Sequence, residues 1–472
     1  MNNIPKIIIE LIYKYLSKRT NNVFRQCSKC LSNIIGSLYF SNTNFRVHII
    51  EKQKHLFRYF VHKYKLTISI TNITNIRTLA YFSTYQLKSI KLNLGSNNPY
   101  SEYFLKEPLQ KLKYGFFFNN QINKKLPSTL RTLKFDRAFN YPINKKILPI
   151  NLKELILSSH FNEPYLFPLN LEILIFGNVF NQEIITLPET LKTLIFGDDF
   201  NNTIKKFPNL ETLIFGENFN RPILSQLPST LITLKFGFAY NELIFENTLE
   251  KLFPNLQNFA IDHTIHKHYK TVQKIQQSFV GLFPPTLKIL EWNRRSIEPN
   301  ILPNLHTLVL GNSFINPIDE NIFPSTLQNI KFGDFYNKPI LQGIFPASLI
   351  TLIFGRFFNQ PIEKHVLPPL LKNLTFGEQF NQLIEETILP SKLTTLIFGE
   401  RFDQSLKKNV LPTTLEILMF GQFYSQDLDW NVLPTSLYYI CFYYEKTLKD
   451  LVPPDYGHIE VREGIAAGHF KF

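Results

Sequence analysis

The stretch LPETLKTLIFGDDFNNTI, residues 187–204, is one copy of a pattern that returns along most of the chain. Other copies read LPSTLITLKFG (227–237), FPASLITLIFGRFFNQPI (345–362) and LPTTLEILMFG (411–421). In the second half of the chain the first leucine of the apolar triplet recurs every 22 residues, at Leu305, Leu327, Leu349, Leu371, Leu393, Leu415 and Leu437. A fixed period of this length predicts a solenoid in which each copy forms one turn.

Each copy contains a short segment that favours a β-strand. In TLIF, residues 193–196, side chains alternate between two sides, so Leu194 and Phe196 point the same way. Gly197 follows at once, and it either takes a positive φ or lets the chain pass close to a neighbouring backbone. Proline, as at Pro208, suits the turn by which the chain returns.

One copy alone offers too few apolar side chains to offset the entropy of ordering its backbone, so the copies must stack. Short crossovers between parallel strands predict a right-handed coil. The Asn of each Phe-Asn or Tyr-Asn pair is predicted to form an inner column that satisfies backbone groups of the turns. This column comprises Asn119, Asn140, Asn162, Asn181, Asn201, Asn220, Asn241, Asn337, Asn359 and Asn381.

The pattern resembles the FNIP repeat, a relative of leucine-rich repeats. Its name is spelt here with permutations, as in Phe-Asn-Arg-Pro-Ile (219–223), Tyr-Asn-Lys-Pro-Ile (336–340) and Phe-Asn-Gln-Pro-Ile (358–362). The resemblance implies a leucine-rich-repeat-like solenoid that binds other proteins, and it brings no catalytic residue. We therefore expect an α/β-type repeat solenoid with one long parallel β-sheet over residues 109–442, in about sixteen copies.

Residues 1–40 carry a different pattern. Between residues 6 and 16 only Lys6, Glu10 and Lys14 are polar, so a helix there is apolar on nearly all sides and must be covered. The segment resembles an F-box, although Leu31 lies near where that family usually has Trp. The resemblance implies docking on a Skp1-like adaptor of a cullin ubiquitin ligase. The matching residues, our candidate adaptor contacts, are Ile4, Pro5, Ile8, Leu11, Ile12, Tyr15, Leu16, Phe24 and Cys27. The alternative is a helical cap on the repeats.

Three further segments depart from the repeat. Residues 41–108 are a transitional segment with the first degenerate copies. An insertion at about 262–283 suits a helix on the flank of the solenoid and is a candidate for target contact. Its His263, His266 and His268 are not predicted to bind metal, because no Cys accompanies them. Residues 443–472 are expected to cap the last turn.

Composition narrows the classes of function. The net charge is +14, but the lysines are scattered, so we do not expect binding to nucleic acid. Three cysteines indicate a reducing compartment. No signal peptide and no apolar run long enough to span a membrane are visible, so we expect an intracellular, cytoplasmic or nuclear protein, in the host-cell cytoplasm for a viral source. Enzyme motifs are absent too, and neither a catalytic residue nor a cofactor nor a metal is predicted.

Side chains opposite the buried Leu and Phe form the exposed face of the predicted sheet. Such β-branched columns stabilise a sheet, and they also offer a strip for a protein partner. The candidate target contacts are Thr193, Ile195, Lys235, Lys331, Ile353 and Ile397. We predict a monomeric, non-catalytic substrate-recognition subunit of a Skp1-cullin-F-box-type ubiquitin ligase. The alternatives are a repeat scaffold whose N-terminal helices only cap the solenoid, and a basic nucleic-acid-binding protein.

Overall fold

The computed structural model describes residues 46–49, 67–71, 89–93, 105, 108–143, 146–240, 248–261, 283–297, 301–442 and 460–463. The chain forms two compact units, Met1–Asp136 and Arg137–Phe472. The F-box-like segment lies outside the described residues. So do nearly all of the insertion and, apart from one strand, the predicted C-terminal cap.

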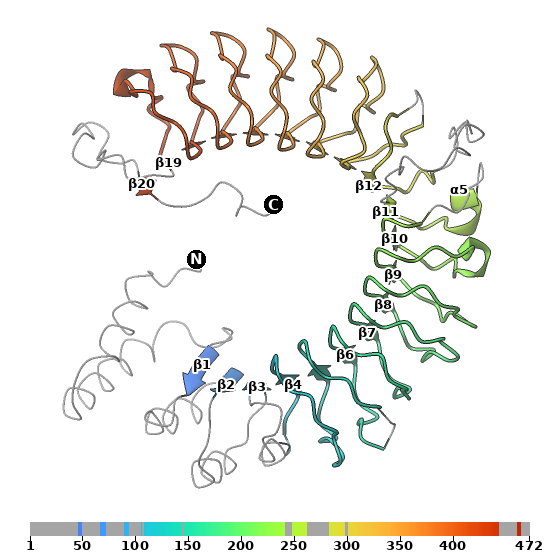
Figure 1. The fold of residues 1–472 in the computed structure, drawn as a ribbon. Helices are drawn as coiled ribbons and strands as arrows, with labels where there is room; N and C mark the ends of the chain where they lie inside the picture. The colour runs from blue at the N-terminus through green and yellow to red at the C-terminus, as the bar shows by residue number, and fades with distance from the viewer. Residues whose placement is uncertain are drawn as a thin grey trace, which may run out of the picture. The chain divides into compact units, whose positions relative to one another are not determined.

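The first unit contains parallel strands (Figure 1). They are β1 (Arg46–Ile49), β2 (Thr67–Thr71), β3 (Ser89–Asn93), β4 (Lys111–Tyr114) and β5 (Thr132–Lys134). Each pairs with the next in the series, and in β3 and β4 the residues Ile90 and Leu112 are opposite each other. Parallel strands thus begin well before residue 109, within the segment predicted to be transitional.

The second unit repeats the same arrangement with strands of three or four residues (Figure 1). They are β6 (Glu154–Ile156), β7 (Ile173–Ile175), β8 (Thr193–Ile195), β9 (Thr212–Ile214), β10 (Thr233–Phe236), β11 (Asn258–Ile261), β12 (Ile289–Trp292), β13 (Thr307–Leu310), β14 (Asn329–Lys331), β15 (Thr351–Ile353), β16 (Asn373–Thr375), β17 (Thr395–Ile397), β18 (Ile417–Met419), β19 (Tyr439–Phe442) and β20 (Glu460–Glu463). Each pairs in parallel with the next, so equivalent residues of successive copies lie side by side.

The connections between strands are extended segments and turns. In the described part of the chain helical structure is limited to α5 (Thr248–Leu252) and the short 3-10 turns η3 (Leu224–Gln226) and η5 (Trp430–Val432). The predicted parallel solenoid is therefore confirmed, but the expectation of an α/β type is wrong for the connections. Many returns contain a proline turn, such as the one in which the N–H of Leu191 donates to the carbonyl oxygen of Pro188.

Aromatic side chains fill much of the core in two parallel columns. One contains Phe176, Phe196 and Phe215, with ring centroids 5.2 Å and 5.4 Å apart. The other contains Phe180 and Phe200, 6.1 Å apart. Within a copy the columns interlock, because Phe196 stacks on Phe200 at 3.9 Å. A ring pair contributes roughly 0.5–1.5 kcal/mol beyond its buried area, so stacking of copies is favourable for every turn added.

Close approach of backbones explains the glycine that follows many of the strands. A Cβ on Gly197 would lie 2.3 Å from the carbonyl oxygen of Gly177, and one on Gly216 would lie 2.1 Å from that of Gly197. Neither glycine has a positive φ; among the described glycines only Gly343 does. Of the two predicted reasons for these glycines, the close approach is the correct one.

In the described residues the predicted asparagine column is present as a ladder of hydrogen bonds, but it is not an inner column, because its side chains are half-buried or exposed. Asn241 lies outside the described residues. The backbone N–H of Asn181 donates to Oδ1 of Asn162 at 3.0 Å, and that of Asn201 donates to Oδ1 of Asn181 at 2.9 Å. The same contact links Asn337 to the N–H of Asn359 at 2.9 Å. Each amide therefore satisfies a turn of the next copy, as expected for backbone groups that the strands leave unpaired.

Candidate protein-binding face

The face of the sheet opposite the core is built from the first and third residues of each strand. In β6 to β9 the middle leucine is buried and its two neighbours are half-buried. This alternation follows from the pleat of a strand, which points successive side chains to opposite faces. One face of β6 to β9 is thus free of core packing.

Four isoleucines form a continuous apolar strip on this face. Ile156, Ile175, Ile195 and Ile214 are the third residues of β6, β7, β8 and β9, and each lies opposite the next in the strand register. We call them the isoleucine strip. All four are half-buried, so aliphatic surface remains available along the strip. The predicted contacts Thr193 and Ile195 lie here, both on β8.

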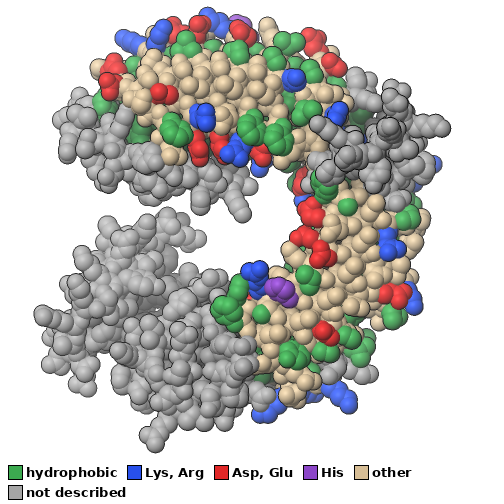
Figure 2. Space-filling view, in the orientation of Figure 1, with side chains coloured by type: hydrophobic (Ala, Val, Ile, Leu, Met, Phe, Trp, Pro, Cys, Tyr) green, Lys and Arg blue, Asp and Glu red, His purple; other side chains and the backbone are tan. Residues whose placement is uncertain are grey.

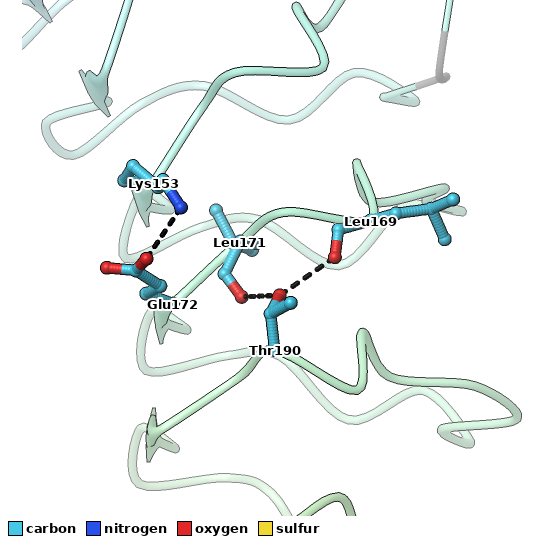
Figure 3. A network of polar contacts seen from close by, with 5 residues as sticks. All are labelled: Lys153, Leu169, Leu171, Glu172 and Thr190. Atoms are coloured by element: carbon cyan, nitrogen blue, oxygen red, sulfur yellow. Dashed lines mark hydrogen bonds and ion pairs between the residues drawn. The ribbon is translucent and has the colours of Figure 1, made fainter.

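One long edge of the strip carries alternating charges, one residue before each strand. Nζ of Lys153 lies 2.6 Å from Oε1 of Glu172 (Figure 3). Nζ of Lys192 lies 2.8 Å from Oε1 of Glu211. A hydrogen bond from Lys192 to Glu211 and the charge of that carboxylate raise the pKa of the lysine. These charges neutralise one another in pairs, and as exposed ion pairs they contribute little to stability.

Figure 3 also shows hydrogen bonds that connect one turn to the preceding turn near this edge. Oγ1 of Thr190 donates to the carbonyl oxygens of Leu169 and Leu171, at 2.8 Å and 2.7 Å. Thr230 and Thr414 make the equivalent contact with the preceding copy. The Ser or Thr before the first core leucine of many copies is therefore a fixed link between neighbouring turns.

The other long edge is acidic beside β8 and β9. Asp198, Asp199 and Glu217 follow the glycines after β8 and β9, and we call them the acidic rim. Nδ2 of Asn178 donates to Oδ2 of Asp198 at 2.6 Å, and Nδ2 of Asn218 donates to Oδ1 of Asp199 at 3.1 Å. None of the three carboxylates forms an ion pair with a described residue. Figure 2 shows acidic side chains at several places on the described surface, among them a group on the inner side at the right of the view.

A charged pair ends the strip after β9. Lys235 and Glu291 form an ion pair between β10 and β12. The residue between them in the register is Ala260 of β11, whose methyl group leaves room for the two long side chains to meet. The predicted target contact Lys235 is therefore already engaged within the chain.

The remaining predicted contacts do not join the strip. Lys331 is exposed on β14 and Ile353 is half-buried on β15, and the next strand places Thr375 in the same column. Ile397 is only 3% exposed, so it is not available on the surface. It packs with Met419 and Cys441 in a cluster that Ile417 and Tyr439 flank.

An exposed aromatic pair was not predicted. The rings of Phe335 and Phe357 stack at 5.3 Å, and the side chains are 55% and 38% exposed. The guanidinium of Arg356 lies 5.5 Å from the ring centre of Phe357, and its Nε lies 2.7 Å from Oε2 of Glu378. The signal was the doublet of aromatic residues two and three positions after the glycine, since the core accepts only the second.

The described ranges contain neither a candidate metal site nor a candidate membrane-spanning helix. No group of three or more His, Cys, Asp or Glu side chains there could hold a metal ion. No helix in the same residues has the length and apolar character to cross a membrane.

A comparison with models of known protein families identifies these repeats. The model of a family described as FNIP Repeat matches residues 118–160, 161–199, 180–208, 200–239, 292–335, 336–379, 358–401, 380–423 and 402–445. Together these matches span more than half of the chain. A comparison with curated proteins finds no match.

Two solved structures are similar in fold. CroV588, described as a novel circular LRR protein, is 27% identical with a TM-score of 0.52, over 84% of this chain and 72% of that one. YopM from Yersinia enterocolitica WA-314 is 18% identical with a TM-score of 0.35, over 85% of each chain. The first similarity supports a solenoid of the leucine-rich-repeat kind.

Proposed function

Because the chain belongs to the FNIP repeat family, we propose that it is a protein-binding repeat protein that acts as the substrate-recognition subunit of a Skp1-cullin-F-box-type ubiquitin ligase. In this proposal residues 1–40 bind a Skp1-like adaptor and the sheet face of the second unit holds the target protein. The chain itself performs no bond chemistry and needs no cofactor.

The observation that carries the binding role is the isoleucine strip. A parallel sheet with both faces covered buries both sets of side chains, whereas here the second set stays half-buried over four consecutive strands. Contiguous exposed apolar surface with a charged border is typical of a site for another protein. The similarity of residues 1–40 to an F-box supports the adaptor-binding part.

The proposed mechanism is proximity. A target held on the repeats and an adaptor held by the N-terminal segment are tethered in one complex. The target lysines then meet the ubiquitin-charged enzyme at a raised effective concentration. The sheet face therefore determines which protein is modified, and the rest of the complex supplies the chemistry.

A pull-down of the tagged full-length chain from a eukaryotic lysate, read by mass spectrometry, tests this proposal. We expect a Skp1-like adaptor and a cullin in the eluate. Changing Ile8, Leu11 and Tyr15 together to Asp should remove both, because charge on an adaptor-facing helix cannot be desolvated. The matched control changes Lys6 and Lys14 to Glu and should leave the recovery unchanged. The ligase role fails if wild-type protein recovers no adaptor, or if the triple variant recovers it equally; the scaffold alternative then holds.

A further inference from the structure

We propose that the isoleucine strip and the acidic rim bind an amphipathic α-helix of the partner, with one aliphatic side chain per turn and Lys or Arg along one side. This inference rests on the proposed protein-binding function and specifies the chemistry of the segment that is recognised. It uses only β6 to β9 and the residues beside them, all within the second unit.

The spacing of the strip favours a helix over an extended segment. Adjacent strands of a sheet lie about 4.8 Å apart, so the four isoleucines repeat at that interval. A helix rises about 5.4 Å per turn and offers one aliphatic side chain per turn at positions i, i+4, i+7 and i+11. An extended chain places side chains of one face about 6.7 Å apart, and it would lose register within three strands.

The charges on the two edges determine which edge the basic side of the bound helix faces. Lys153, Glu172, Lys192 and Glu211 pair among themselves and leave their edge without net charge. The carboxylates of Asp198, Asp199 and Glu217 have no described cationic partner, in a protein whose net charge is +14. A helix seated on the strip would present its basic side to the rim, where oppositely charged groups select partners and speed association.

The strip also sets the length of the helix. Three strand intervals span about 14 Å, which corresponds to about 10 residues of helix. The Lys235–Glu291 pair follows on β10 and β12, so apolar side chains beyond this length would meet charged groups. The partner segment is therefore short, with about three turns in contact.

Binding of designed peptides to the full-length protein tests the inference. The probes are three fluorescent helical peptides of about 14 residues. The basic peptide has Leu at one position per turn and Lys along one side. A second peptide replaces the Lys by Glu, and a third keeps the basic composition but distributes the Leu around the helix. Fluorescence anisotropy should give at least about tenfold tighter binding for the basic peptide than for the other two.

Two pairs of variants locate the site. Ile195→Asn should weaken binding of the basic peptide by about tenfold, whereas Ile353→Asn, in the same column on β15, should change it by less than about twofold. Asp198→Lys should weaken the basic peptide and strengthen the acidic one. Asp334→Lys is its control, since it also follows a glycine and makes the same charge change outside the rim.

Several results would overturn the inference. Equal binding of the three peptides excludes recognition of an amphipathic basic helix. Equal effects of Ile195→Asn and Ile353→Asn, or of Asp198→Lys and Asp334→Lys, place the peptide elsewhere. Circular dichroism of each variant verifies that the fold is kept. Adaptor recovery depends on residues 1–40, so failure of the peptide experiment and failure of the ligase role are distinguishable.

Discussion

At the scale of single residues, the glycine that follows many of the strands allows the backbones of two turns to stack closely. A Cβ on Gly355 would lie 2.0 Å from the carbonyl oxygen of Gly333, and the two glycines follow paired strands, β15 and β14. The contact cannot be relieved by rotating a side chain. Close stacking of backbones, rather than a turn conformation, therefore favours glycine at Gly355.

We predict that Gly355→Ala destabilises the protein by about 1–3 kcal/mol, the cost of overpacking a well-packed site. Urea unfolding followed by circular dichroism measures it. The control is Gly343→Asn, because Gly343 has φ +87° and nothing within 4 Å of a built Cβ, and Asn occupies the same conformation at Asn321 and Asn409. This control should be close to neutral. Equal stability of Gly355→Ala and wild type would contradict the close approach.

A second prediction concerns Tyr336. Its side chain is buried in a column where the neighbouring copies have Phe314 and Phe358, and its hydroxyl has no hydrogen-bond partner. Tyr336→Phe should therefore be neutral or stabilising by up to about 1 kcal/mol at neutral pH, since an unsatisfied buried hydroxyl is removed.

The pH dependence of this variant provides a separate test. Desolvation raises the pKa of Tyr336 above its ordinary value of 10.0, so the folded protein retains a proton that the unfolded chain loses. The stability of wild type should then decrease as pH rises above about 10, because the unfolded state binds fewer protons. In Tyr336→Phe this part of the decrease is absent. An advantage of the variant that does not grow between neutral and alkaline pH would contradict the prediction.

At the scale of elements, the asparagine ladder continues with a different residue near its end. Asp403 takes the place of Asn, and its Oδ1 accepts from the N–H of Ser425 at 2.7 Å and from Nε2 of Gln426 at 3.1 Å. Partial desolvation acts to raise the pKa of Asp403, but the hydrogen bonds from Ser425 and Gln426 outweigh it and hold the pKa below its usual range. At Asp403 the ladder therefore contains a carboxylate that is protonated at low pH, unlike the asparagine amides.

We predict that Asp403→Asn removes part of the acid sensitivity of the fold. The lowered pKa contributes stability that is present above the unfolded value of 3.8 and is lost as pH falls through the folded value. The variant keeps an oxygen that can accept from Ser425 but cannot be protonated in this range. Urea unfolding at neutral pH and below pH 4 measures the difference. Asp403→Ala is the control, since it should be less stable at both pH values.

The strands and their register could be predicted from the sequence, because the alternation in TLIF (193–196) recurs at a nearly constant period. The ladder of Asn162, Asn181 and Asn201 followed from the same period, since equivalent residues of stacked turns must meet. The period could not give the burial of Ile397, which depends on what packs around one column at one place. Nor could it identify Lys235 as paired, because that contact reaches across an intervening strand.

The candidate binding face was predicted only in part, for the same reason. Thr193 and Ile195 are on the strip, yet the strip is defined by its neighbours Ile156, Ile175 and Ile214, and these were not selected. The repeat pattern alone does not distinguish the copies that form a binding surface from those that do not. Only the structure shows where consecutive copies leave aliphatic surface beside carboxylates that form no ion pair with a described residue.

At the scale of the whole molecule, every described turn depends on the turns beside it. The links between copies are the parallel strand pairs, the stacked rings and the side-chain ladders, and they recur with the same partners from β14 to β18. Stability of such an array is approximately a sum of terms for single turns and for adjacent pairs. A deletion should therefore be tolerated when it removes one whole period.

We predict that deleting residues 349–370, one period of 22 residues, gives a folded protein with a smaller free energy of unfolding. Leu371 then follows Ser348, Asn381 takes the place of Asn359 beside Asn337, and Phe376 meets Phe332. Deleting residues 349–359 instead removes half a turn and puts core leucines out of register, so it should abolish cooperative unfolding. Urea unfolding and far-ultraviolet circular dichroism distinguish the two deletions. If the full-period deletion unfolds the chain as the half-period one does, the stacked turns do not carry the fold in the way the contacts indicate.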